Sequence, residues 1–271
     1  WTEAEEEAET QRVTLHLRGR TTGKHVFDIS LVGPGIEGRN QIMAPKIRLE
    51  EADKQRGQLG ISPEPGVRLH LHERARVTEL DPSRLGIPSS DARAFRLLDS
   101  EWFLLLDIEK VDPWVEALTF QDVWVRDGQV LTECQLQYEV KYAGIDRFMV
   151  QLPAEAESVI MDGDYLSDTI RGVEGEDGKV AWTVKLAPRI MGHYSLKISY
   201  QGSFSGKTQW VRIQDVTTTS DLRRGYLVLR AGGRLQVSPR SEVTALQAID
   251  RESIPSTLTR GGVGQEGSFF S

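Results

Sequence analysis

The chain has 271 residues and a formal net charge of -7, with 33 Lys and Arg against 40 Asp and Glu. This acidic balance argues against a surface built for nucleic-acid phosphates. The single cysteine, Cys134, excludes an internal disulfide, and no apolar run reaches the roughly 20 residues that a membrane-spanning helix needs. Hydrophobic residues still make up 39% of the chain, so we expect a packed core and more than one domain.

Residues 1–12 are predicted to form an acidic linker, because their glutamates repel one another and no apolar stripe accompanies them. The opposite end, "GSFFS" at 267–271, resembles the start of a further apolar element. We therefore expect the sequence to be a segment of a longer protein.

Residues 13–112 are predicted to form an N-terminal β domain, in which short alternating runs are separated by loops rich in Gly, Pro, Asn, Asp and Ser. One or two helical turns are expected at 49–57. The predicted strands lie at 13–17, 25–31, 42–49, 66–72, 92–98 and 102–111.

Residues 113–218 are predicted to form an antiparallel β-sandwich of immunoglobulin-like type. In the strand at 130–142, even-numbered residues from Thr132 to Tyr142 should face the core and odd-numbered residues should face water. Cys134 lies on the inward side, which favours a buried, inert thiol. Residues 147–152 are expected to be the antiparallel partner across a turn at "AGID", and further strands are expected at 179–186 and 193–200.

Residues 219–271 are predicted to contain a C-terminal hairpin that turns at Gly232 and Gly233, followed by an irregular tail. This part either packs back on an earlier sheet or opens a further unit.

Two histidines, His70 and His72, are two positions apart and would share one face of a strand, which suits a pair of metal ligands. Glu73 is adjacent in the sequence, and His16 and His25 lie upstream, but no third ligand follows from spacing. Solvated strand histidines are the simpler interpretation, and the same holds for His193.

The loop at 161–168 places Asp162, Asp164 and Asp168 around a glycine, as some calcium loops do. A hairpin end also explains this composition. The run "GPGIEG" at 33–38 matches the spacing of a dinucleotide-binding loop, but no helical pattern follows it, so an inter-strand loop is expected and no cofactor is predicted.

Tryptophans provide the other candidate site. Trp182 falls on the apolar side of its strand, whereas Trp124 and Trp210 share sides with polar residues and are candidates for contact with a sugar or a partner. No G-x-S-x-G, HExxH or cysteine–base arrangement points to catalysis.

The runs "YAGIDRFMVQLPAEAESVIMDG" and "GKVAWTVKLAPRIMGHYSLKISYQGSF" resemble the β-sandwich segments of large, membrane-anchored bacterial envelope proteins of uncharacterised function. The resemblance covers about residues 115–215. It implies a sandwich fold and an extracytoplasmic, periplasmic or cell-surface location, and it transfers no catalytic residue.

The sequence thus favours a non-catalytic extracytoplasmic scaffold or protein-interaction module, whose partners are other proteins or other domains of the parent chain. One alternative is a carbohydrate-binding module of an envelope or secreted enzyme, with Trp124 and Trp210 in a row on one exposed face and polysaccharide as partner. A second alternative is a metal-dependent hydrolase that uses His70 and His72.

Overall fold

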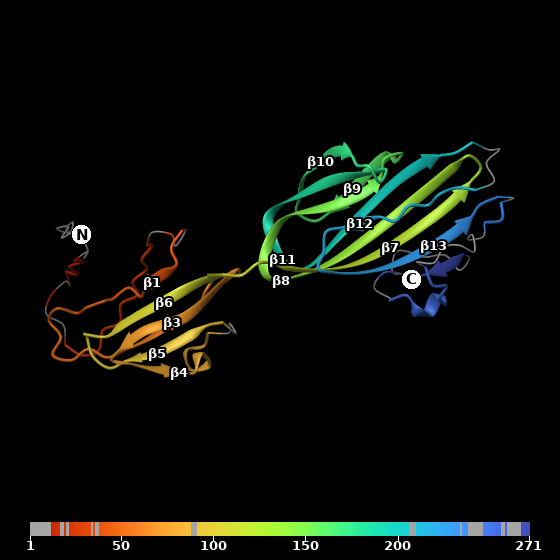
Figure 1. Cartoon of the computed structure of the whole chain (residues 1–271). Coiled ribbons are helices and arrows are strands. Elements are labelled where there is room, and N and C mark those ends of the chain that lie inside the picture. The colour runs from red at the N-terminus through yellow and green to blue at the C-terminus, as the bar shows by residue number, and fades with distance from the viewer. Residues whose placement is uncertain are drawn as a thin grey trace. The chain divides into compact units, whose positions relative to one another are not determined.

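The computed structural model describes residues 12–16, 19, 22–33, 35, 38–87, 91–205, 210–233, 235–237, 246–255, 258 and 267–271. The chain is all-β, and its sheets are mostly antiparallel and sandwich-like, which confirms the predicted fold class (Figure 1). None of the helices within these ranges is long and apolar enough to cross a membrane.

Residues 1–38 form a unit separate from residues 39–271. Its described residues contain no strand, so the strands predicted at 13–17 and 25–31 are wrong as far as the structure describes them. The acidic linker lies almost wholly outside the described residues. The helical turns predicted at 49–57 are also absent, since residues 50–51 form a turn and a strand begins at Gly57.

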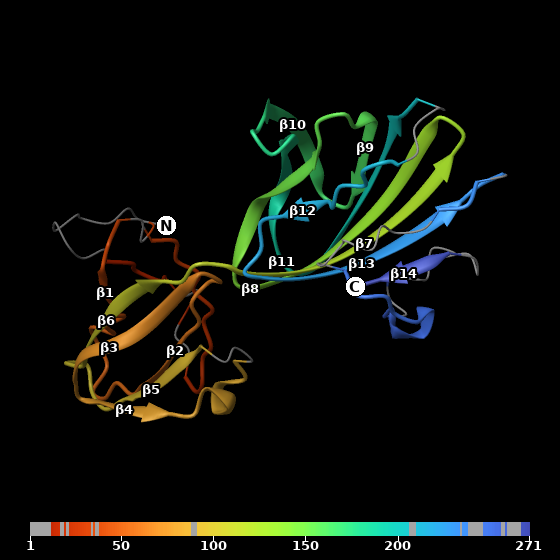
Figure 2. The ribbon, with the colours of Figure 1, turned by 45° about the vertical axis from the view of Figure 1, so that its right-hand side comes forward.

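Two three-stranded antiparallel sheets make up the part of the chain from residue 41 to residue 110, called here the small sandwich (Figure 2). One sheet has the order β1-β6-β3 and the other β2-β5-β4, and the 3-10 helix η1 (Pro82–Leu85) follows β4. The bounds are β1 Gln41–Met43, β2 Gly57–Ile61, β3 Val67–Ala75, β4 Val77–Leu80, β5 Arg93–Leu97 and β6 Phe103–Lys110.

The core of the small sandwich follows the alternation of its strands. Leu104 and Leu106 on β6 are buried, and they belong to the same apolar cluster as Phe95 on β5 and Trp102. The two sheets are therefore held together by side-chain packing between their inner faces.

Residues 114–271 form a second assembly, called here the large sandwich, around one eight-stranded sheet. The main path is β10-β11-β8-β7-β13-β14, while β9 pairs with β11 and β12 pairs with β8. The bounds are β7 Trp114–Arg126, β8 Gln129–Pro153, β9 Glu157–Gly163, β10 Leu166–Glu174, β11 Lys179–Ser203, β12 Thr217–Thr218, β13 Leu222–Ala231 and β14 Ser268–Phe270.

Strands β8 and β11 each have 25 residues, bend midway and contribute to both layers of the sandwich (Figure 1). The first half of β8 pairs with β7 and with the second half of β11, and its second half pairs with the first half of β11. The turn predicted at "AGID" is therefore wrong, because β8 continues through it. The strands expected at 179–186 and 193–200 are likewise two parts of one strand, β11.

The bend in β8 explains why the predicted face of one residue is wrong. Tyr142 has a left-handed backbone (φ 70°) and exposes 61% of its surface, whereas the next residue, Ala143, is buried. The register against β11 also shifts between Lys185 and Gly192. This irregularity moves the inward side from Val140 to Ala143 and lets the strand pass from one layer to the other.

Aromatic and aliphatic side chains fill the space between the two halves of the bent sheet. The rings of Tyr138 and Phe148, both on β8, stack with centroids 3.8 Å apart, and the Tyr194 ring lies 5.5 Å from Phe148. Leu136 is fully buried in this cluster, and Cys134 exposes only 2% of its surface. The buried, inert thiol expected from the sequence agrees with this position, because burial raises the pKa of Cys134.

The C-terminal part packs back on this sheet. Strand β13 pairs in parallel with β7 and antiparallel with β14, and residues 235–237 form no strand, so the predicted hairpin at Gly232 and Gly233 is wrong. Beyond the 3-10 helix η2 (Arg251–Ser253), Ile254 and Leu258 cover Phe120 on the outer face of β7. The continuous sheet and its parallel pair do not confirm the narrower immunoglobulin-like prediction.

Candidate functional site

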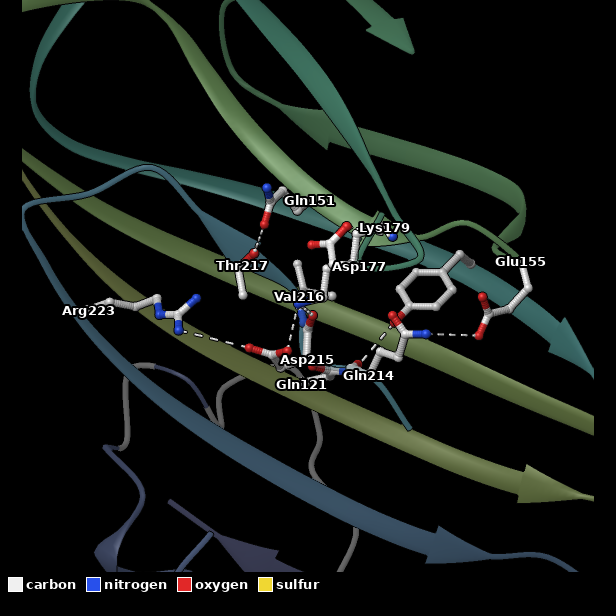
Figure 3. A network of polar contacts seen from close by, with 11 residues as sticks. Gln121, Gln151, Glu155, Asp177, Lys179, Gln214, Asp215, Val216, Thr217 and Arg223 are labelled. Carbon is white, nitrogen blue, oxygen red and sulfur yellow. Dashed lines mark hydrogen bonds and ion pairs between the residues drawn. The ribbon is translucent and has the colours of Figure 1, made fainter. Parts of the chain in front are cut away.

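A segment without regular pairing along most of its length, residues 210–218, lies over the inner face of the large sandwich and is called here the strap. Its anchor is Gln121, a buried side chain on β7. The Gln121 Nε2 donates to the carbonyl oxygen of Gln214 at 3.0 Å, and its Oε1 accepts from the backbone N–H of Val216 at 3.2 Å (Figure 3). One amide thus satisfies both a backbone acceptor and a backbone donor in the interior.

Further contacts fix the C-terminal half of the strap (Figure 3). The Lys179 ammonium donates to Asp215 Oδ1 at 2.7 Å and to the Asp215 carbonyl oxygen at 3.1 Å. The Thr217 hydroxyl donates to Gln151 Oε1 at 2.7 Å, where β12 pairs with β8. The strap therefore connects β7 in one layer with β8 and β11 in the other.

The N-terminal half of the strap closes one side of a half-open cavity of about 220 Å³, called here the end cavity. It lies where the strand ends meet: Thr132 comes from the start of β8, Pro153 from its end, and Tyr200 from the end of β11. Because β8 bends back, the two ends of one strand reach the same cavity. Its remaining lining is Val130, Glu155, Ala156, Gln201, Gly202, Ser203, Phe204, Trp210, Val211, Arg212, Ile213 and Gln214.

The lining of the end cavity combines aromatic surface with hydrogen-bonding groups. Trp210 exposes 66% of its surface at the cavity. Gln214 Nε2 donates to Glu155 Oε1 over 3.4 Å, while the Gln214 Oε1 is buried and has no partner among the described residues. Burial raises the pKa of Tyr200, so this phenol keeps its proton at neutral pH.

The second candidate tryptophan lies elsewhere. Trp124 is on the outer face of β7, opposite Leu131, with the Arg126 guanidinium 4.1 Å from its ring centre. Trp210 instead lines the cavity beside the inward-facing Val130 and Thr132. The two tryptophans therefore do not form the row on one exposed face that the carbohydrate-binding alternative predicted.

The predicted histidine pair lies on the outer face of the small sandwich. His70 Nε2 is 2.6 Å from Glu109 Oε2, and His72 Nδ1 is 3.0 Å from Asp107 Oδ2. Gln41 on β1 also donates to Asp107 at 2.8 Å. Each histidine thus has its own carboxylate partner on β6, and no group of three potential metal ligands occurs within the described residues.

These contacts alter the two carboxylates. The hydrogen bond from His70 lowers the pKa of Glu109 below its usual value. Hydrogen bonds from Gln41 and then His72 do the same for Asp107. Both effects favour the ionised acids on an exposed surface, which suits a stabilising polar ladder across β1, β6 and β3.

The aspartates of the predicted calcium loop are exposed and separate. Asp162 lies on β9 at the register position of Lys197, Asp164 is in the turn after β9, and Asp168 on β10 is 3.4 Å from the Lys185 ammonium. The structure does not bring the three together as a metal site in the part of the chain that it describes.

The remaining glycines and histidines singled out in the sequence also form no site in the described residues. Gly33, Gly35 and Gly38 precede strand β1 rather than a helix, and the positions between them lie outside the described residues. His193 is exposed on β11 at the position of Glu139 on β8. His16 and His25 belong to the separate N-terminal unit.

Sequence reasoning identified Trp210 but missed its cavity neighbours Glu155, Arg212 and Gln214. These residues come from two connections that are far apart in the chain, after β8 and before β12, and no local spacing links them. Comparison with known proteins adds no further guide, because no family model and no curated protein matches the chain.

Proposed function

We propose that this chain is a non-catalytic, extracytoplasmic interaction module, whose sandwiches form a scaffold and whose partners are other proteins or further domains of its parent chain. The observation that carries the proposal is an exposed apolar segment at residues 25–32. Phe27, Ile29, Leu31 and Val32 in this segment each expose more than half of their surface.

The pattern of this segment is that of a half-buried strand. Phe27, Ile29 and Leu31 alternate with Asp28 and Ser30, so an extended chain would carry them on one side. Yet the segment pairs with no strand among the described residues. Several exposed apolar side chains close together in one segment are typical of a site of protein–protein interaction.

The partner that fits this pattern is a β-sheet with an unpaired edge and an apolar face beside it. An extended peptide that joins such an edge gains backbone hydrogen bonds, and its alternate side chains enter apolar pockets. Residues 25–32 would then be the added strand.

The ionisable chemistry of the described residues also supports binding over catalysis. The Cys134 thiol is buried in the core, and burial raises its pKa, which disfavours the reactive thiolate. His70 and His72 make contacts with separate carboxylates on an open sheet surface. The extracytoplasmic location is inferred from the resemblance of residues 115–215 to envelope β-sandwiches.

Site-specific photocrosslinking of the full chain in its producing cells tests the proposal. A benzoylphenylalanine is introduced at Val32, and a matched control places it at Ile170, which is exposed on β10. We expect one adduct of defined mass from position 32 and none of that mass from position 170. The triple variant Phe27→Ser, Ile29→Ser, Leu31→Ser should remove the adduct.

Lack of any adduct from position 32, or an adduct that survives the triple serine variant, would contradict the proposal. Protease treatment of intact spheroplasts tests the location separately. Full protection of the chain under those conditions would rule out an extracytoplasmic position.

A further inference from the structure

We propose that the end cavity of the large sandwich binds one neutral sugar ring, with Trp210 as the stacking surface. This inference goes beyond the proposed protein-interaction function, because it concerns a different kind of ligand and a different part of the chain from residues 25–32. The two proposals can therefore fail independently.

The first argument is the aromatic surface. The Trp210 indole is two-thirds exposed, although Phe204 and Ile213, close to it in sequence and in the cavity wall, pack partly into the apolar cluster of Val123 and Val125. A large aromatic side chain exposed beside polar groups suits a ligand with an apolar face and a polar rim. The C–H face of a pyranose ring has this character.

The second argument is an unmet hydrogen-bonding group. Gln214 Oε1 is buried and has no partner among the described residues, whereas the Nε2 of the same amide only contacts Glu155 at 3.4 Å. Buried polar atoms are nearly always satisfied, so an acceptor beside the cavity calls for a donor. A rotation of the Gln214 amide would turn this oxygen toward the cavity, where a ligand hydroxyl can donate to it and can also reach the Glu155 carboxylate.

The third argument is charge. The cavity lining contains one carboxylate, Glu155, and one guanidinium, Arg212, so its formal charge is balanced. The Glu155 carboxylate would repel a phosphate or a uronic acid, and the Arg212 guanidinium would repel an amine. A neutral ligand with several hydroxyls can donate to Glu155 and accept from Arg212 without either penalty.

The fourth argument is size. The volume of about 220 Å³ lies below the roughly 300 Å³ at which drug-sized pockets begin, and the cavity is open on one side. A single ring fits this space, and its exocyclic groups can extend into solvent. The cavity thus suits an end residue or a side branch of a neutral glycan.

Saturation-transfer NMR on the full chain with glucose, galactose, mannose and N-acetylglucosamine tests the inference. We expect transfer to the ring protons of at least one sugar. Trp210→Ala should weaken binding about tenfold, as expected for the loss of one aromatic contact, and Trp210→Phe should retain part of the affinity. Glu155→Gln should also weaken binding, because it removes the charged acceptor.

Trp124→Ala is the matched control, since this tryptophan lies on the outer face of β7 and should leave binding unchanged. Thermal unfolding of each variant identifies any loss of fold. Three results would overturn the inference: no transfer to any of the four sugars, equal binding by wild type and a folded Trp210→Ala variant, or stronger binding of glucuronate or glucosamine than of glucose.

Discussion

The small and the large sandwich reach a two-layered β core by different routes. In the small sandwich the layers are separate three-stranded sheets, whereas in the large sandwich one sheet bends over itself because β8 and β11 run through both layers. In the first, the layers are joined by side-chain packing, by the ion pair between Arg74 on β3 and Glu79 on β4 (3.8 Å), and by the one-residue connection between these strands. Backbone pairing continues from layer to layer in the second, and Gln121 and the strap add polar contacts inside it.

The two sandwiches also differ in where their stabilising polar side chains lie. The small sandwich has its polar ladder on an exposed outer face, at His70, His72, Asp107 and Glu109. The large sandwich has a buried amide, Gln121, on its inner face. We therefore expect core truncation to unfold the small sandwich but only to weaken the large one, acid to act on the small sandwich, and loss of internal hydrogen bonds to act locally in the large one.

The largest expected effect is that of Phe95→Ala in the small sandwich. Phe95 is fully buried between the sheets, and truncation of a buried phenylalanine typically costs about 3–5 kcal/mol of unfolding free energy. Small domains bury less surface and have little stability to lose, so we expect this sandwich to unfold. Hydrogen exchange resolved by peptide should show lost protection in β2 to β6.

Leu196→Ala in the large sandwich provides the comparison. Leu196 is equally buried, and the expected cost is about 2–5 kcal/mol, but its strand continues through both layers. We expect the sheet to remain protected from exchange with a lower denaturation midpoint. Complete loss of protection in the large sandwich alone would mean that the continuous sheet gives no advantage.

A smaller effect is expected for Gln121→Ala. The substitution leaves the Gln214 carbonyl oxygen and the Val216 N–H without their partner, at a cost of about 1–3 kcal/mol. Faster exchange should be confined to the strap and β12 at first. Gln135→Ala, on the outer face of β8, is the control, and an equal loss of stability in both variants would contradict the anchoring role of Gln121.

The smallest effect is expected for the acid response of the small sandwich. Asp107 and Glu109 have folded-state pKa values below their usual 3.8 and 4.5, so their contribution to stability is present above those values and is lost as the pH falls below about 4. Peptide-resolved hydrogen exchange in β3 and β6 can follow this unfolding separately from the large sandwich.

The double variant Asp107→Asn, Glu109→Gln should flatten that acid dependence, and high salt should weaken it because the pairs are exposed. An unchanged pH profile in the double variant would assign the acid response to other groups. The large sandwich offers an internal reference in the same measurement.

The sequence predicted the fold class because alternation is a local signal. Leu136, Tyr138 and Val140 face the core as their spacing indicated, and Leu104 and Leu106 do so in the small sandwich. The sequence did not predict that β8 continues past residue 142. Gly144 and Asp146 are typical of turns, but pairing with β11 on both sides of them overrides that local preference.

The candidate site was less accessible to prediction than the fold. Trp210 could be singled out by residue type, but the end cavity depends on the bend that brings Thr132 and Pro153 of one strand together. At 13–17 and 25–31, by contrast, the sequence predicted strands that the structure does not contain among its described residues. Their alternation is real, but it finds no partner strand among the described residues, since pairing depends on a neighbour as well as on pattern.

The burial of Cys134 makes thiol labelling a direct measure of opening in the large sandwich. It is the only cysteine in the chain, and it is buried in the core cluster of the large sandwich, where burial raises its pKa. A thiol-specific reagent can reach it only when the two halves of the bent sheet separate. The rate at which this one thiol is labelled therefore measures how often the large sandwich opens under native conditions. Opening of the small sandwich does not change that rate, because the small sandwich contains no cysteine.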